Sequence, residues 1–111
     1  MAEKRQASVY GHRLREAREA HDISQRDLGV AVGLDEFAAS PRINRYENGV
    51  NQPKLGMQQL LARALGLPLA YFYAEDDELA QLIVDFGRKD KPSQALAKIK
   101  KKKRQRGRKL R

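Results

Sequence analysis

The side chains best suited to chemistry in this chain are polar groups gathered between residues 40 and 51. They are Ser40, Arg42, Asn44, Arg45, Asn48 and Asn51. An arginine can donate two hydrogen bonds to O6 and N7 of guanine, and an asparagine can bond N6 and N7 of adenine in the same two-point manner. The segment therefore favours a surface that reads the edges of bases.

Groups that could carry out a reaction are not arranged in this way. The 111 residues include no cysteine, no glycine-rich phosphate loop, and two histidines that no spacing joins to carboxylates. Asp76, Asp77 and Glu78 are explained by a helix start, where acids stabilise the dipole. We expect no enzyme, metal or cofactor. No apolar run approaches the roughly 18 residues of a membrane span, so we expect a soluble, cytoplasmic protein associated with the nucleoid and not with membranes.

Two short helices should position the polar groups. The first is predicted to begin after Ser24, whose hydroxyl suits an N-cap, and to bury Leu28 and Val32. The second is predicted to begin at Ser40, because Ser-Pro suits the N-cap and the first helical position, where the missing proline N–H costs nothing.

The second predicted helix would bury Ile43 and Tyr46, which lie three residues apart, and Asn48-Gly49 would end it in a left-handed conformation. The arginine and asparagine side chains of this helix would then face outward.

This segment resembles the phage-repressor and Cro-like helix-turn-helix family, often called the XRE family. The residues that carry the resemblance are Ser24-Gln25, Leu28-Gly29, Val32-Gly33-Leu34, and Ile43-x-Arg45-Tyr46-Glu47-x-Gly49 followed by Pro53. The resemblance extends from about Tyr10 to Leu82. It implies an all-α, five- or six-helix, lambda-repressor-like DNA-binding domain in which the small Gly29 lets two helices cross closely.

The resemblance also implies roles for individual residues. Gln25 corresponds to a phosphate-contacting glutamine, although helix capping would also explain it. Ser40, Pro41 and Arg42 fall where the first bases are read, Pro41 offering at most an apolar contact to a thymine methyl, and Arg45 lies one turn further on. Arg42 is the strongest candidate reader. Asn44 faces either bases or the backbone, and Asn48 and Asn51 are candidates for phosphate oxygens.

An internal ion pair is implied as well. In the family, an arginine seven residues before the glutamine pairs with the glutamate of the recognition helix, and these positions are Arg18 and Glu47 here. The alternative is that Arg18 is one more exposed arginine, like its neighbours Arg13 and Arg15, on a helix between Tyr10 and His21.

One feature departs from the family pattern. Leu34 and Ile43 are nine positions apart, where the family has about five. Residues 35–38 are the expected insertion, which forms either a longer loop or an extra turn of helix. Phe37 in this insertion would either pack on the domain or face a partner.

The rest of the domain is predicted to be helical. Leu55 to Leu65 reads as a helix with Leu60, Leu61 and Leu65 inward, ended by Gly66, and residues 69–73 read as a short helical turn that packs in the core. A last short helix carries an apolar stripe of Leu79, Leu82, Ile83 and Phe86, which must pack on the domain or on another chain.

Charge divides the chain unequally. The net charge is +9, but residues 88–111 hold thirteen lysines and arginines and one acid, so residues 1–87 are mildly acidic. We expect an arm at 1–9, a domain at 10–87, and a disordered basic tail at 88–111 that binds nucleic acid nonspecifically. The tail cations assigned to this role are Lys98, Lys100, Lys101, Lys102, Lys103, Arg104, Arg106, Arg108, Lys109 and Arg111.

The favoured function is a sequence-specific transcriptional regulator, most simply a repressor, that binds double-stranded DNA as a homodimer. Two alternatives stay open. One is an antitoxin-like autorepressor that holds a protein partner through the stripe at residues 79–86, and the other is a nucleic-acid-binding adaptor that grips RNA with its tail.

Overall fold

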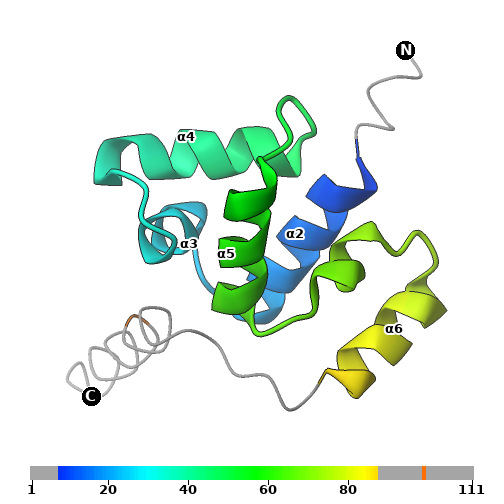
Figure 1. Cartoon of the computed structure of the whole chain (residues 1–111). Helices are drawn as coiled ribbons and strands as arrows, with labels where there is room; N and C mark the ends of the chain where they lie inside the picture. Colours follow the sequence, from blue (N-terminus) through cyan, green and yellow to red (C-terminus); the bar gives the residue numbers. More distant parts are fainter. Residues whose placement is uncertain (1–7, 88–98, 100–111) are drawn as a thin grey trace.

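The computed structural model describes residues 8–87 and residue 99. Within these residues the chain forms five α-helices and one 3₁₀ helix, with no strand (Figure 1). They are α2 (Val9–Ala20), α3 (Gln25–Ala31), α4 (Glu36–Glu47), α5 (Leu55–Leu65), η1 (Leu69–Tyr73) and α6 (Asp77–Phe86). The all-α prediction is confirmed. None of these helices is long and apolar enough to cross a membrane.

Local capping explains where the helices begin. Ser8 accepts a hydrogen bond from the amide of Gly11, Ser24 from that of Asp27, and Asp76 from that of Leu79, at 2.8, 2.9 and 3.1 Å. Each bond satisfies a backbone donor that the first turn of a helix leaves free. Gly66 ends α5 at φ 69° and Gly49 follows α4 at φ 75°, as the sequence predicts.

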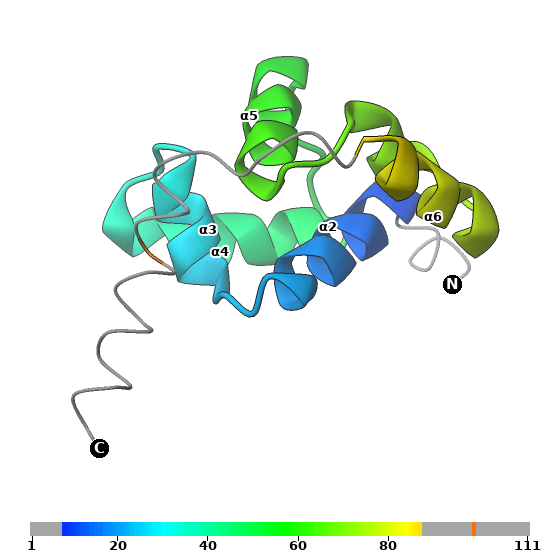
Figure 2. The same cartoon turned by 90° about the horizontal axis from the view of Figure 1, so that it is seen from below.

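One apolar core joins these helices. Leu14, Leu28, Ile43, Leu61 and Phe72 are fully buried and come from α2, α3, α4, α5 and η1 in turn. The helix α2 packs against both α4 and η1, while α3 packs against α4, and α6 lies at the opposite end of the domain from the start of α4 (Figures 1 and 2). Every element of the helix-turn-helix segment is therefore anchored in the core.

The predicted start of the second helix at Ser40 is wrong. The helix α4 begins at Glu36, after Asp35, whose carboxylate accepts a hydrogen bond from the amide of Phe37 at 3.0 Å. Ser40 and Pro41 are the fifth and sixth helical residues. The inserted residues 35–38 thus form an extra turn of helix and not a longer loop, and the Asp35 cap prevails over the Ser-Pro signal.

Pro41 in the helix interior gives a first prediction. Proline cannot donate to the carbonyl of Phe37 four residues earlier, and its ring crowds that carbonyl. Replacing Pro41 with alanine should therefore raise the free energy of unfolding by about 1–3 kcal/mol. Chemical denaturation of both full-length proteins would measure this gain, and an unchanged or lower stability would contradict the interior placement of Pro41.

Arg13 also differs from its prediction as an outward residue. Its side chain is only 2% exposed; Nε donates to the carbonyl of Ala74 at 2.8 Å, while the two terminal nitrogens pair with Glu16 at 2.8 Å and Asp77 at 3.1 Å. These bonds outweigh the effect of burial, so the pKa of Arg13 lies above its ordinary value. Arg13 thereby ties α2 to the segment that leads into α6.

Leu60, predicted inward, is instead 42% exposed.

The carboxylate of Glu16 gives a second prediction, which concerns pH. Burial alone raises the pKa of Glu16, but hydrogen bonds from Tyr71 at 2.7 Å and from Arg13 outweigh it and hold the pKa below its ordinary 4.5. When the pKa of a carboxyl group is lower in the folded than in the unfolded state, the group stabilises the fold at pH values above its unfolded-state pKa. This stabilisation is lost as the pH falls through the folded-state pKa.

Glu16→Gln should therefore lower the free energy of unfolding most near neutral pH. The difference in free energy of unfolding between the variant and the unaltered protein should decrease as the pH is lowered below 4.5. Thermal or urea unfolding of both proteins at a series of pH values would test this. Parallel stability curves for the two proteins would contradict it.

Candidate nucleic-acid interface

The closely packed pair α3 and α4 forms the frame of the site. A Cβ atom built on Gly29 of α3 would lie 2.6 Å from Cβ of Ala39 on α4. Real Cβ atoms do not approach this closely, so only glycine allows the two helices to cross at this separation. The resemblance predicted this use of Gly29, and the structure confirms it.

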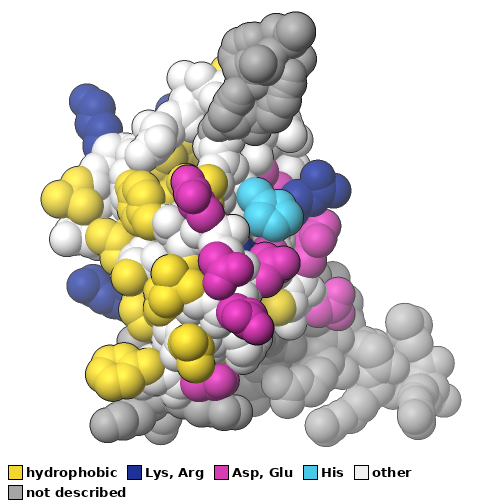
Figure 3. Space-filling model, turned by 90° about the vertical axis from the view of Figure 1, so that its right-hand side faces the viewer, with side chains coloured by type: hydrophobic (Ala, Val, Ile, Leu, Met, Phe, Trp, Pro, Cys, Tyr) yellow, Lys and Arg dark blue, Asp and Glu magenta, His cyan; other side chains and the backbone are white. Residues whose placement is uncertain are grey.

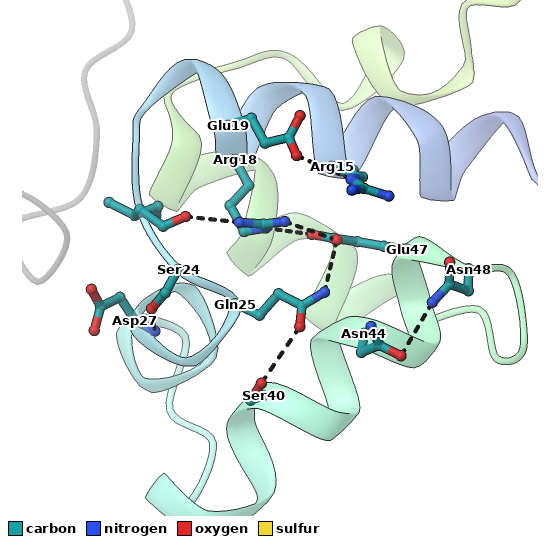
Figure 4. Close-up of polar contacts among 11 residues, drawn as sticks. Arg15, Arg18, Glu19, Ser24, Gln25, Asp27, Ser40, Asn44, Glu47 and Asn48 are labelled. Carbon is teal, nitrogen blue, oxygen red and sulfur yellow. Dashed lines mark hydrogen bonds and ion pairs between the residues drawn. The ribbon is translucent and has the colours of Figure 1, made fainter.

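A chain of polar contacts fixes both helices against α2 (Figure 4). Arg18 Nε lies 2.6 Å from Oε2 of Glu47, and Nη2 lies 3.2 Å from Oε1, so the pair is bidentate. The third contact of Arg18 is to the carbonyl of Ile23 at 2.8 Å. The side chains are 12% and 2% exposed. The predicted ion pair is therefore present and largely removed from water.

The same contacts extend to the start of α3. Gln25 Nε2 donates to Oε1 of Glu47 at 3.0 Å, and the hydroxyl of Ser40 donates to Oε1 of Gln25 at 3.5 Å (Figure 4). One N–H of the Gln25 side-chain amide therefore bonds Glu47, and its oxygen accepts from Ser40. The second N–H of this amide can donate to a ligand. Ser40, predicted as a helix cap, instead links α4 to α3.

The outward face of α4 carries several of the other predicted side chains. Residues spaced by three and four positions share a helix face, and the exposed members on this one are Phe37, Pro41, Asn44, Arg45 and Asn48. Asn48 Nδ2 donates to Oδ1 of Asn44 at 3.1 Å (Figure 4), which orients both amides along the helix.

Arg42 lies on the flank of α4 rather than at the centre of this face. It lines a hollow of about 480 Å³ together with Arg45, Asn51 and Lys54. The hollow therefore gathers cations from α4 and from the loop that follows it, which suits a phosphate or a base edge. The structure thus brings Arg42, Arg45 and Asn51 together at one hollow.

The sequence reasoning missed one residue at this surface, Lys54, and left the position of another, Phe37, open. Lys54 follows the loop proline directly, and its charge beside Pro53 was a usable signal. Phe37 was expected either to pack on the domain or to face a partner, and its side chain is 88% exposed, so it does not pack on the domain. The tail cations between residues 98 and 111 lie outside the described residues, so their role stays a prediction.

Acidic side chains near the interface are largely paired. Glu47 is bound by Arg18, and Glu36 in the first turn of α4 is bound by Arg26 of α3. Among residues 8–87 no group of three or more acidic or histidine side chains could hold a metal ion. The exposed charge on α4 beyond its first turn is therefore basic, in contrast to the mildly acidic domain as a whole.

Comparison with known proteins assigns the fold and this segment to a class. A family model described as Helix-turn-helix matches residues 14–72, more than half of the chain, and the chain belongs to this XRE-type helix-turn-helix family. The crystal structure of the transcriptional regulator BswR is similar, with a TM-score of 0.67 and 44% identity, covering 69% of this chain and 76% of that one.

A curated relative supports the same class. An uncharacterized HTH-type transcriptional regulator, y4wC of Sinorhizobium fredii (strain NBRC 101917 / NGR234), is 34% identical over 65 residues, which are 59% of this chain. The chain covers 43% of that relative's length, so the similarity spans less than half of that protein.

Proposed function

We propose that this protein is a sequence-specific DNA-binding transcriptional regulator that acts as a repressor, in the cytoplasm on the nucleoid. The observation that carries the proposal is the outward face of α4, where Arg45, Asn44 and the flanking Arg42 stand exposed on a helix held by the Arg18–Glu47 pair. Bidentate donors on a rigid helix are what base readout in the major groove requires.

In this proposal α4 enters the major groove and α3 crosses the backbone. Gln25 has a free N–H at the first turn of α3, so it donates to a phosphate while Glu47 fixes its direction. Asn48, Asn51 and Lys54 contact neighbouring phosphates from the end of α4 and the loop. Repression follows if the occupied site overlaps a promoter.

The helix α6 supplies the surface for a homodimer. Leu79, Leu82 and Phe86 are 48%, 64% and 87% exposed, and Ile83 is partly buried against the core. Figure 3 shows hydrophobic side chains gathered beside acidic ones on this side of the domain. Pairing two copies through α6 would bury this stripe and present two α4 helices to half-sites about one helical turn apart.

The same exposed stripe favours a second candidate, an antitoxin-like autorepressor whose α6 holds a different protein. Sedimentation of the purified full chain separates the two: a stable homodimer that Leu82→Asp dissociates supports the dimer, while a monomer supports a partner of another kind.

Selection from random DNA duplexes tests the DNA-binding proposal. The full chain should enrich a twofold-related motif at near-physiological salt. Arg45→Ala and Arg42→Ala should each weaken the binding free energy for that motif by about 1–3 kcal/mol, and should change binding to random duplex little. Replacing the tail cations with glutamine should weaken binding to the selected and the random duplex alike, and should make the affinity depend less on salt concentration. Enrichment of no motif would overturn sequence-specific binding and favour the adaptor.

A further inference from the structure

Phe37 occupies an unusual position on the reading helix. Its side chain is 88% exposed, so it contributes little to the core, and it lies in the first turn of α4. A single exposed apolar side chain needs no explanation by itself. The location matters here, because this turn is the one that the insertion adds to the helix.

The extra turn extends the outward face of α4 toward its N-terminus. Phe37 lies four residues before Pro41 and seven before Asn44, so the three side chains follow one another along the same face. Four added residues lengthen a helix by about 6 Å. Since the N-terminal part of a recognition helix contacts base edges, Phe37 extends the reading surface by one turn.

The charges around Phe37 are compatible with approach to DNA. The insertion brings two carboxylates, which phosphates would repel. One of them, Glu36, is bound by Arg26 of the neighbouring helix α3. The other, Asp35, accepts the hydrogen bond from the Phe37 amide at 3.0 Å. Arg26 thus offsets the charge of Glu36, and the helix N-terminus stabilises the charge of Asp35, while the phenyl ring is left exposed to solvent.

The thymine methyl group is the apolar feature of the major groove that a phenyl ring can contact. The ring cannot donate to or accept from base edges in the manner of arginine or asparagine, but it packs on the C5-methyl group of thymine. Pro41, the next side chain on the face, is also apolar and has no N–H. The face therefore changes from apolar at Phe37 and Pro41 to polar at Asn44 and Arg45.

We propose that Phe37 is a specificity-determining residue that packs on thymine methyl groups at one end of each half-site. This inference rests on the proposed function. A dimer contact for Phe37 is the competing use, but α6 and the first turn of α4 lie at opposite ends of the domain (Figures 1 and 2). The exposed stripe of α6 and the Phe37 ring are therefore separate surfaces.

Methyl-group removal provides the test. The full chain is titrated onto its selected duplex and onto duplexes in which single thymines are replaced by uracil, which removes only the C5-methyl. At the contacted position the uracil duplex should bind about fourfold more weakly for one buried methyl group. Phe37→Ala should bind both duplexes equally, whereas Phe37→Leu should keep part of the difference.

The controls distinguish failure of the Phe37 role from failure of the proposed DNA-binding function. Leu60→Ala removes another exposed apolar side chain, on α5, and should keep the full thymine preference. Unfolding curves establish that each variant is folded. A selected motif with equal binding of thymine and uracil duplexes, or a thymine preference that survives Phe37→Ala, overturns the role of Phe37 alone. Failure of the unaltered chain to select any motif overturns the proposed function and this inference with it.

Discussion

Replacing Arg18 with methionine is expected to lower the free energy of unfolding by about 3–5 kcal/mol, because it leaves the Glu47 carboxylate buried without its cation. The Glu47 side chain is 2% exposed, and Arg18 supplies two of the contacts of its carboxylate. Only the Gln25 amide, at 3.0 Å, would remain of the side-chain donors seen here. Methionine keeps the length of the side chain, so the loss reports mainly the missing charge.

A double-mutant cycle separates the pair from its surroundings. Glu47→Gln alone should also destabilise the domain, but the double variant should lose about 1–3 kcal/mol less than the sum of the single losses. Arg15 provides the matched control on the same helix, since its pair with Glu19 is 59% and 55% exposed. Arg15→Met should cost at most about 1 kcal/mol. If Arg15→Met and Arg18→Met lowered the free energy of unfolding equally, burial of the Arg18–Glu47 pair would add nothing to its effect on stability.

The parts of the fold that the sequence predicted correctly depend on local signals that agree with tertiary packing. Leu55 to Leu65 was predicted with the bounds that the structure has, because an apolar period and Gly66 indicate the same end. The short turn at residues 69–73 has its predicted bounds too. The pairing of Arg18 with Glu47 came from the family resemblance, since no local pattern joins residues 29 positions apart.

The errors occur where two local signals compete or where a long-range contact decides. Ser40-Pro41 is a good helix start in isolation, but Asp35 offers an earlier cap and Ala39 must already be helical to lie against Gly29. Arg13 looks like its exposed neighbours on α2. Its burial depends on the carbonyl of Ala74, 61 residues away, which no sequence pattern reveals.

The candidate interface was predicted in composition more than in arrangement. Arg42 was the favoured reader, whereas the structure places it on the flank of α4 and puts Arg45 and Asn44 on the outward face. Its place on the flank follows from the buried face of the helix, which Ala39, Ile43 and Tyr46 define. Because α4 begins at Glu36, its first turn carries Phe37, for which the sequence left packing on the domain and contact with a partner as open alternatives.

Replacing Gly29 with alanine tests whether the close crossing of α3 and α4 is required. The added Cβ would lie 2.6 Å from Cβ and 2.9 Å from Cα of Ala39, so backbone as well as side chain must move. Overpacking of this kind costs about 1–3 kcal/mol. It should outweigh the helix-propensity gain of up to about 1 kcal/mol that alanine has over glycine.

Gly56 is the matched control, because it is also helical and a Cβ there would meet nothing within 4 Å. Gly56→Ala should therefore stabilise the domain by roughly 0.5–1 kcal/mol, while Gly29→Ala destabilises it. Adding Ala39→Gly to Gly29→Ala should recover part of the loss by removing the nearest atom. Opposite signs at the two glycines would establish that the contact with Ala39, and not helix propensity, determines the residue at position 29. A stabilising Gly29→Ala would show instead that the two helices can separate at no cost, and the rigid α3–α4 frame on which the proposed base readout depends would then lose its support.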